Sequence, residues 1–391
     1  MLKNIKYIDW KLLLKITGLV SVWRLVLFLI GAVAPFVFPF KPSYPYYEGL
    51  LKHFGPDWLV EWAGFDGVHY ITIIQNGYFG TGLIQAFFPV YPLLVYLFNW
   101  ISNPIVIGIL LSHFFFIGAL YLWVLLLKKQ NIKLSWIEMI LPFLLFPSAF
   151  FFGAVYTESL FLFLVFLCLF LLKQKKLFYA TIIAALASAT RVVGIMLVPM
   201  MMVGVYVDWK QQKFRNALSV IKNLGISAIG SIGLLTYMAY LWIVFHDPLY
   251  FLHVQNEFGG GRQEQFILLP QVLYRYVKIF IAMPGWSWSY YAYAQELAIT
   301  LLVVGVLSWI TYKHWRSQLA ELIFAWGIVL LPPLTGTLQS MPRYVLVAFP
   351  VFVAWVGLRK THAPVYWALC AFSAVFLILN ILLFIQGMWI A

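Results

Sequence analysis

The sequence predicts an all-α fold, a polytopic transmembrane helical bundle of about 11 helices. Of its 391 residues, 63% are hydrophobic and only 10% are charged, whereas soluble domains are about half apolar and a quarter charged. The apolar residues gather in runs of roughly 16 to 25, the length that crosses a bilayer core. The period-two alternation of a membrane barrel is absent from the sequence, and helices satisfy their own backbone groups in lipid.

Long apolar runs such as LFLFLVFLCLFLL and VFLILNILLFI define the expected spans. The first span follows the basic stretch MLKNIKYIDWKLLLK. No small-residue cleavage site comes after it, so we expect a retained helix. The expected spans are 14–38, 86–101, 104–127, 134–152, 155–172, 177–190, 191–207, 224–245, 292–312, 319–336, 344–358 and 364–386.

The formal net charge of +13 could indicate a nucleic-acid partner. Its placement favours another explanation, because lysine and arginine cluster at the ends of expected spans, as in the cytoplasmic loops of membrane proteins. These clusters lie at 128–133, 173–176, 210–222, 313–316 and 359–360. We therefore expect membrane lipids as the surroundings and no nucleic-acid partner.

Two long segments, 39–85 and 246–291, interrupt the spans and lack a dense basic cluster. We expect both outside the cytoplasm, with their tryptophans and tyrosines at the membrane interface. If 86–101 and 104–127 both cross the membrane, the basic segment KKQNIK lies outside the cytoplasm, which conflicts with the charge rule. Either one of these segments is interfacial or re-entrant, or the charge rule fails there. No fixed-period repeat or soluble region is evident, so we expect one membrane domain over 1–391.

Asp66 lies in EWAGFDGVHYITIIQNGY, within the first long loop. In helical register Asp66 shares a face with His69 and Tyr70, since residues three and four apart are neighbours. A carboxylate at a membrane interface is partly desolvated, which makes it a better base. The alternative is structural, because aspartate is also a favoured N-cap of a short helix.

Three further segments carry candidate residues. QAFFPVYPLL contains Tyr91 between aromatic residues and prolines, which is also typical of an interfacial aromatic belt. In FPSAFFFGAVYTESLFLF, Glu158 directly precedes an apolar run, although a polar loop between two spans is ordinary. Arg191 in ASATRVVGIM needs a partner. That partner is either Asp66 or Glu158 in a structural pair, or the phosphate of a lipid-linked substrate.

SMPRYVLVAFP repeats this pattern with Arg343 and Tyr344 at the outer end of a span, which suits an anionic lipid head group. The segment YFLHVQNEFGGGR offers Gln255, whose planar amide suits sugar hydroxyls, beside residues that a mobile outer loop would also contain. Its histidine and glutamate match no compact metal motif such as HExxH, so no catalytic metal is expected. The chain also contains no Walker A, GxGxxG or GxSxG motif.

The ordered motifs FDGVHYITIIQNGY, AFFPVYP, FPSAFFFGAVYTESLF, ATRVVGI and MPRY resemble those of the PIG-V mannosyltransferase family. These are glycosyltransferases of the GT-C class, and the eukaryotic members add the second mannose to glycosylphosphatidylinositol. The resemblance covers residues 61 to 350, about three quarters of the chain. The family usually has tryptophan directly before the aspartate. Here Phe65 occupies that position and Trp62 lies four residues before Asp66.

The resemblance implies a GT-C fold and an inverting transfer of a hexose, with mannose expected. The donor would be a polyprenyl-phosphate sugar, and no resident cofactor would be needed. The acceptor would be a lipid-linked or extracytoplasmic glycan or protein. Asp66 would be the base. Substrate contacts would come from His69, Tyr70, Tyr78, Tyr91, Glu158, Arg191, Gln255, Arg343 and Tyr344. A prokaryotic member, multi-pass in the cell membrane with an extracytoplasmic active site, is expected.

Two other function classes remain open. A transporter or flippase for a lipid-linked sugar would use the same arginines and aromatic residues without chemistry, although such proteins often show internal repeats. A non-catalytic subunit of a glycan-assembly complex would be inert alone. Polar residues gathered near one side of the predicted bundle favour the enzyme.

Overall fold

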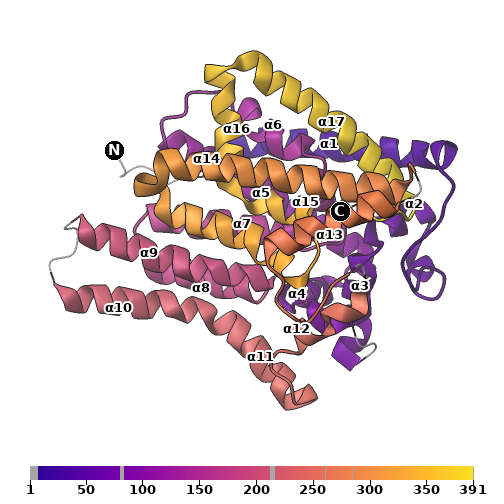
Figure 1. Cartoon of the computed structure of the whole chain (residues 1–391), viewed down its shortest axis with the longest axis horizontal. Helices are drawn as coiled ribbons and strands as arrows, with labels where there is room; N and C mark the ends of the chain where they lie inside the picture. The colour runs from indigo at the N-terminus through magenta and orange to yellow at the C-terminus, as the bar shows by residue number, and fades with distance from the viewer. Residues whose placement is uncertain (1–7, 80–82, 212–215, 260, 284, 391) are drawn as a thin grey trace. The chain divides into compact units, whose positions relative to one another are not determined.

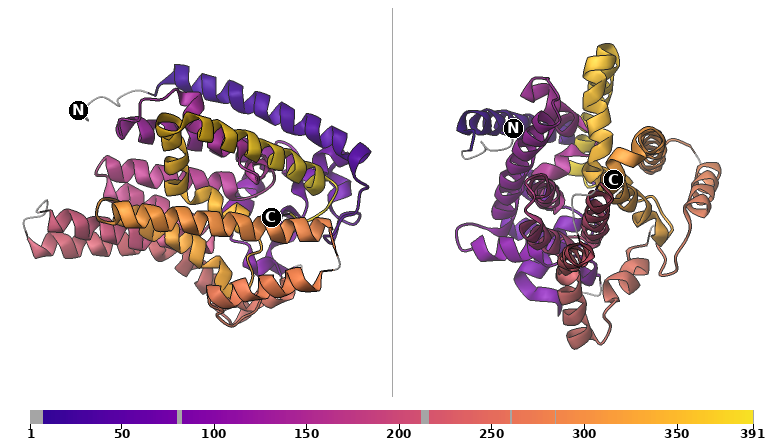
Figure 2. Two further views of the ribbon diagram at one scale, coloured as in Figure 1. Left: turned by 45° about the horizontal axis from the view of Figure 1, so that its top comes forward. Right: turned by 90° about the vertical axis from the view of Figure 1, so that its left-hand side faces the viewer.

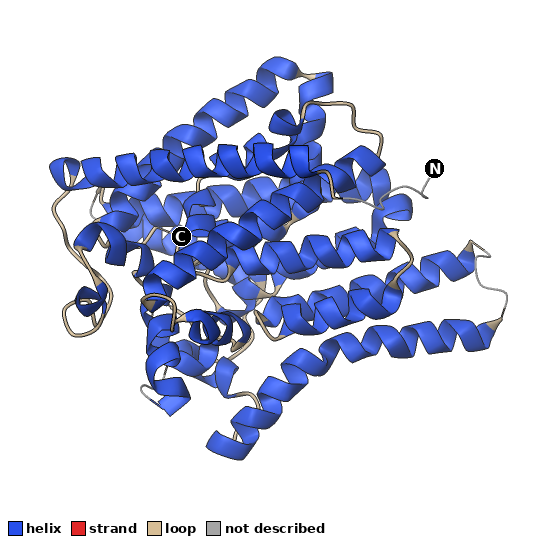
Figure 3. Cartoon of the chain, turned by 180° about the vertical axis from the view of Figure 1, so that it is seen from behind, coloured by secondary structure: helices blue, strands red, loops and turns tan. Residues whose placement is uncertain are grey.

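The computed structural model describes residues 8–79, 83–211, 216–259, 261–283 and 285–390. Within these residues it consists of α-helices joined by turns and short 3-10 helices, with no strand (Figures 1 and 3). The prediction of an all-α fold is therefore confirmed. Part of the basic cluster at 210–222 lies outside the described residues.

Six of the described helices are long and apolar enough to cross a membrane, and a seventh crossing is possible if one bent pair is a single broken span. The bent pair, Met341–Val347 and Phe349–Thr361, turns by 72°. Such helices indicate a membrane-embedded protein. The six are Trp10–Val37, Pro104–Lys129, Val192–Lys210, Ala217–Phe245, Trp288–Thr335 and Ala363–Ile385.

The chain forms two compact units. Unit 1 comprises Met1–Val68, Leu94–Ala180 and Ala354–Met388, and unit 2 comprises His69–Leu93, Thr181–Val353 and Trp389–Ala391. Each unit is built from segments that are distant in the sequence. The expectation of one membrane domain stays a prediction.

Unit 1 is a helical layer packed around α5. The helix α5 contacts α7, α1 and α6, and α1 also runs against α17 (Figure 2). At one end of this unit, the Arg359 Nε donates to the Glu138 carboxylate over 2.6 Å, which ties α6 to the C-terminal helices. The helices are α1 (Trp10–Val37), α2 (Asp57–Val60), α5 (Pro104–Lys129), α6 (Trp136–Leu145), α7 (Glu158–Lys173) and α17 (Ala363–Ile385).

Unit 2 is organised by α14, which contacts α9, α13 and α15. Its helices are α9 (Leu197–Lys210), α10 (Ala217–Ala228), α11 (Ile232–Phe245), α12 (Tyr250–His253), α13 (Leu269–Ala282), α14 (Trp288–Leu330) and α15 (Met341–Tyr344). The unit boundaries fall inside four more helices, α3 (Asp66–Asn76), α4 (Val90–Phe98), α8 (Leu177–Ser188) and α16 (Phe349–Thr361).

Local sequence sets several helix starts. The Asp9 side chain caps α1, and Asn103 caps α5 with Pro104 at the first helical position. Ser135 and Glu138 form a reciprocal capping box at the start of α6. Each cap satisfies backbone N–H groups that have no partner within the helix.

Several predicted spans differ from the structure, among them 134–152 and 177–190, where α6 and α8 have only 10 and 12 residues. The segment 86–101 contains only the nine-residue α4, about half the length that crosses a bilayer. Of the alternatives left open for 86–127, this favours the one in which the first segment does not cross. The expected spans 292–312 and 319–336 form one helix, α14, with non-helical backbone at Gln318.

Candidate active site

Asp66 lies at the first position of α3, and the chain just before it is fixed within unit 1. Phe65 has φ 55°, a left-handed conformation that is uncommon for an aromatic residue. The Tyr156 hydroxyl donates to the Gly64 carbonyl over 2.8 Å, and the Val155 N–H donates to the Trp62 carbonyl over 3.0 Å. These contacts hold a half-buried Asp66 at the helix start.

Glu158 follows the same anchoring segment and is fully buried at the first position of α7. The residues before it are also buried, and the Ser112 hydroxyl donates to the Ala154 carbonyl over 2.8 Å. An ordinary polar loop between spans would be solvated. The structure therefore joins the segments of Asp66 and Glu158 by direct hydrogen bonds inside unit 1.

In unit 2, three predicted residues converge on the AFFPVYP segment. The His69 ring stacks on Phe87 with 4.7 Å between centroids, and Tyr70 meets Phe87 edge-on at 5.2 Å. Tyr70 also lies 5.3 Å from Tyr91. The Tyr78 hydroxyl donates to the Phe87 carbonyl over 2.7 Å. Because these rings are buried, they form an internal cluster instead of an exposed interfacial belt.

The structure also brings Arg191, Arg343 and Tyr344 together in unit 2. The Arg191 guanidinium carbon lies 4.9 Å from the centre of the Tyr344 ring. Tyr344 directly follows Arg343 on α15, and Arg343 is 4% exposed, with its guanidinium 5.8 Å from the Trp389 ring. Arg191 therefore lies over the residue that follows Arg343 on this short helix. Guanidinium groups are suited to binding a phosphate.

Glu296 supports this arginine pair and was not predicted. It lies in α14, is 1% exposed, and accepts hydrogen bonds from the Tyr276 hydroxyl and the Ser340 N–H. Ser340 has φ 69° and precedes α15, so the buried carboxylate holds the turn that leads to Arg343. A lone glutamate inside an apolar run was the only sequence signal available.

Replacing Tyr276 by phenylalanine is expected to lower the free energy of unfolding by about 1–3 kcal/mol. The Tyr276 hydroxyl donates to Glu296 and accepts from the Leu338 N–H over 3.1 Å, and both groups are buried. The measurement is thermal unfolding of the detergent-purified protein. On the same helix, Tyr274 is 58% exposed and its hydroxyl has no protein hydrogen bond among the described residues. Equal losses from Tyr276→Phe and Tyr274→Phe would contradict the buried-network role.

Gln255 forms hydrogen bonds within the protein, one of them with Arg262, another arginine. Its amide oxygen accepts from the Arg262 guanidinium over 2.9 Å, and its amide nitrogen donates to the Phe251 carbonyl over 3.0 Å. The Arg262 guanidinium lies 5.2 Å from the Phe258 ring, and that ring lies 6.1 Å from His69. The loop after α12 therefore reaches the His69 cluster.

Arg24 is a second residue that the sequence reasoning missed. It lies in the middle of α1, is 7% exposed, and donates to the Gly153 carbonyl over 2.9 Å. Its guanidinium carbon lies 3.9 Å from the Phe28 ring and 4.0 Å from the Trp62 ring. Arg24 thus contacts both chain segments, the one that precedes Asp66 and the one that precedes Glu158. A single charge within an expected span could have indicated it.

Glu61, the other acid near Asp66, is 8% exposed. Burial, reinforced by the nearby Asp57, raises the pKa of its carboxyl group from 4.5 to about 8. The folded protein therefore keeps a proton that the unfolded chain releases. This stabilising contribution is fully present below pH 4.5 and is lost as the pH rises toward 8.

Unfolding of the wild type is accordingly expected to become easier between pH 5 and pH 8, by up to about 1.4 kcal/mol per pH unit from this group. Glu61→Gln should remove that part of the slope, and should stabilise the protein most at the alkaline end. Glu48→Gln is the control, because Glu48 is an exposed acid paired with Lys52 in the same loop. Parallel pH profiles for wild type and Glu61→Gln would contradict the assignment.

No group of three or more histidine, cysteine, aspartate or glutamate side chains in the described part of the chain is arranged to hold a metal ion. The chemistry that the geometry offers comes from carboxylates, guanidinium groups and aromatic rings. Comparison of the chain with protein-family models, curated proteins and solved structures finds no match. The functional assignment therefore depends on the motifs and on the site geometry.

Proposed function

We propose that this protein is an inverting glycosyltransferase that moves a hexose, with mannose expected, from a polyprenyl-phosphate sugar to a lipid-linked or extracytoplasmic glycan or protein acceptor. The observation that carries this proposal is the Arg191 guanidinium over the ring of Tyr344, the residue that follows the buried Arg343, in a membrane-embedded chain. Arg343 is buried and Arg191 is half-buried, and a guanidinium group is a good ligand for a phosphate, which a lipid-linked donor brings from within the membrane.

In the proposed reaction, Asp66 takes the proton of the acceptor hydroxyl as that oxygen attacks the anomeric carbon. The bond from the anomeric carbon to the phosphate oxygen breaks, and the polyprenyl phosphate leaves with the electron pair. Arg191 and Arg343 stabilise the negative charge that shifts onto this oxygen. His69 orients Asp66 or contacts the sugar. Tyr70, Tyr78, Tyr91 and Glu158 line or support the sugar site.

Gln255 contributes to the proposed site through Arg262, which it holds, instead of contacting the sugar alone. The GT-C fold and a total of about 11 crossings belong to the same proposal. The proposed orientation belongs to it as well. If the short α4 does not cross the membrane, α5 does, and the basic residues at 128–133 then lie in the cytoplasm, in agreement with the charge rule. The active site is then extracytoplasmic.

The test uses the purified protein in liposomes with labelled polyprenyl-phosphate mannose and a lipid extract as the source of acceptor. Transfer of label to a new product supports the proposal. Movement of labelled donor across the bilayer without a change in its head group would instead indicate a flippase. Activity that appears only after a second protein is added would indicate a subunit of a complex. Other prenyl-linked sugars are tested in parallel to identify the donor.

A further inference from the structure

Helix α13 presents an exposed apolar stripe on the outside of unit 2. Tyr274, Val277 and Ile281 follow one another at spacings of three and four residues, so they lie on one face of the helix. These side chains are 58%, 51% and 81% exposed. The buried residues of α13, Val272 and Tyr276, lie on a different face. The helix is therefore apolar both toward the protein and away from it.

The inner face of α13 is attached to unit 2 by hydrogen bonds. The Tyr276 hydroxyl donates to Glu296 and accepts from the Leu338 N–H. The Arg275 guanidinium donates to the Gly336 carbonyl over 3.1 Å. Because these bonds fix the rotation of the helix about its own axis, the stripe keeps its outward direction and is a built surface.

Contacts with α14 place α13 beside the start of a candidate membrane span (Figure 1). The ring centre of Phe280 lies 5.1 Å from that of Tyr290, and the ring centre of Tyr276 lies 5.7 Å from that of Tyr293. Tyr290 and Tyr293 belong to the first turns of α14, whose sequence is WSYYAYA. Such an aromatic run is typical of the boundary between lipid and water. The stripe of α13 therefore lies at that boundary.

A lysine lies beside the stripe. Lys278 is exposed, and its Nζ lies 4.6 Å from the centre of the Tyr274 ring. In the described part of the chain no carboxylate pairs with Lys278, and the sequence contains no acid from Gln265 to Gln295. A cation without an acidic partner, next to an apolar stripe, suits a lipid whose head group carries a phosphate.

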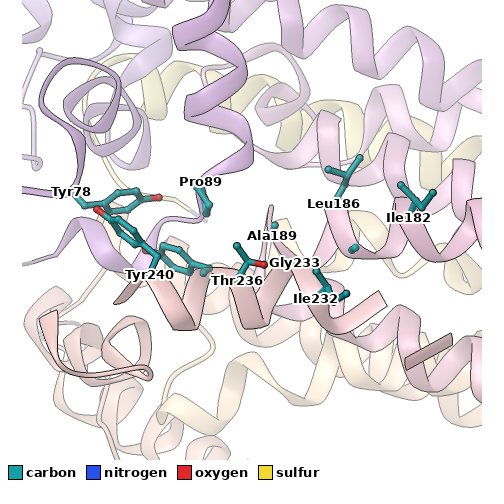
Figure 4. Close-up of a pocket in the computed structure, with 11 residues that line it drawn as sticks. Tyr78, Pro89, Ile182, Leu186, Ala189, Ile232, Gly233, Thr236 and Tyr240 are labelled. Carbon is teal, nitrogen blue, oxygen red and sulfur yellow. The ribbon is translucent and has the colours of Figure 1, made fainter. Parts of the chain in front are cut away.

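Size and charge together favour lipid as the occupant of this stripe. Because α13 is about 21 Å long and 10 Å wide, its stripe offers on the order of a few hundred Å², less than the roughly 800 Å² that each partner buries in a stable protein interface. Charge also distinguishes the stripe from the groove between α8 and α11. The residues that line that groove are uncharged (Figure 4), and within it Gly233 lies against the Ala185 carbonyl.

We infer that the outer stripe of α13 docks on phospholipid at the membrane boundary, with Lys278 at the head-group phosphate and Tyr274, Val277 and Ile281 against the acyl chains. Trp286, which is 88% exposed just before α14, extends the same contact. A preference for anionic lipid follows, because Lys278 attracts a head group with a net negative charge. The inference requires only a membrane-embedded chain and does not depend on sugar transfer.

The test measures quenching of the fluorophore bimane in the full-length protein in liposomes. Bimane is attached to single cysteines in Val277→Cys, Ile281→Cys and Gln271→Cys, and Gln271 is the exposed polar position of the same helix. Lipids with brominated acyl chains quench from the hydrocarbon, and iodide quenches from water. The ratio of lipid to iodide quenching is expected to be at least about threefold higher at Val277 and Ile281 than at Gln271. The wild type, whose two cysteines are buried, controls for background labelling.

Lipid selectivity tests the role of Lys278. Brominated phosphatidylglycerol should quench bimane in Ile281→Cys at least about twofold more strongly than brominated phosphatidylcholine at equal mole fraction. Lys278→Gln should remove this difference. Lys313→Gln is the matched control and should preserve it, because Lys313 is also exposed and lies 4.7 Å from the ring of Trp309, four residues before it.

Iodide quenching at Val277 and Ile281 equal to that at Gln271 would overturn the inference, because the stripe would then face water. Disulfide bonds between copies of Ile281→Cys, in place of lipid quenching, would also overturn it and indicate self-association. An unchanged lipid preference in Lys278→Gln would overturn the head-group contact. All substituted positions are exposed, and the unfolding temperature of each variant is compared with that of the wild type.

Discussion

Asp66→Asn is expected to slow sugar transfer by about 10²–10⁴-fold, the usual contribution of a positioned base. The amide keeps the shape of the side chain but cannot take the acceptor proton. This substitution also separates the two interpretations of Asp66, because asparagine is as good an N-cap as aspartate. A purely capping role therefore predicts nearly unchanged activity. The measurement is kcat/KM with labelled prenyl-phosphate sugar in proteoliposomes.

Glu48→Gln serves as the matched control, since Glu48 is an exposed acid of the same loop. Its transfer rate should stay within about twofold of wild type. Full activity of Asp66→Asn would show that a residue other than Asp66 is the base. Glu158→Gln would then be the next variant, because Glu158 lies on the segment bonded to the residues around Asp66.

Arg343→Gln is expected to lower kcat/KM by about 10²-fold. This is comparable to the loss of one hydrogen-bond donor that stabilises developing negative charge in the transition state of other enzymes. Arg343 is buried under Trp389 and next to Tyr344, so the site would lose charge where water does not replace it. Arg343→Lys should recover only part of the rate, because an ammonium group does not reproduce the planar fork of a guanidinium group.

Arg316→Gln is the control for this series, because Arg316 is an exposed arginine of α14. The unfolding temperature of each variant is measured alongside its rate. A rate for Arg343→Gln equal to that of Arg316→Gln would remove Arg343 from the phosphate site. A partial recovery in Arg343→Lys at equal stability would support a charge-specific role.

Much of the fold could be predicted because long apolar runs carry their own signal. The expected spans 14–38, 104–127 and 364–386 correspond closely to α1, α5 and α17. The segment 86–101 was predicted less well, because Pro89 and Asn99 bound a helix of only nine residues inside an otherwise apolar stretch. Hydropathy alone does not distinguish such a segment from a crossing.

The candidate site was predictable only where motifs carried it. The helix expected around Asp66, His69 and Tyr70 is present as α3, and Arg191 lies over the ring of Tyr344, the residue after Arg343. The roles of these residues stay predictions. The supporting residues Arg24 and Glu296 were missed because their partners are distant in the sequence. Arg24, for example, donates to a residue 129 positions away. Such contacts exist only after the chain has packed.

The close approach of Gly233 to Ala185 brings the backbones of α8 and α11 into direct contact. Such a contact cannot adjust as a side chain does, because a carbonyl group has no alternative rotamer. The spacing of this helix pair is therefore set by the backbone itself. Gly233→Ala should force the two helices apart and lower the unfolding temperature, whereas Gly225→Ala, which has open space around it, should leave that temperature unchanged.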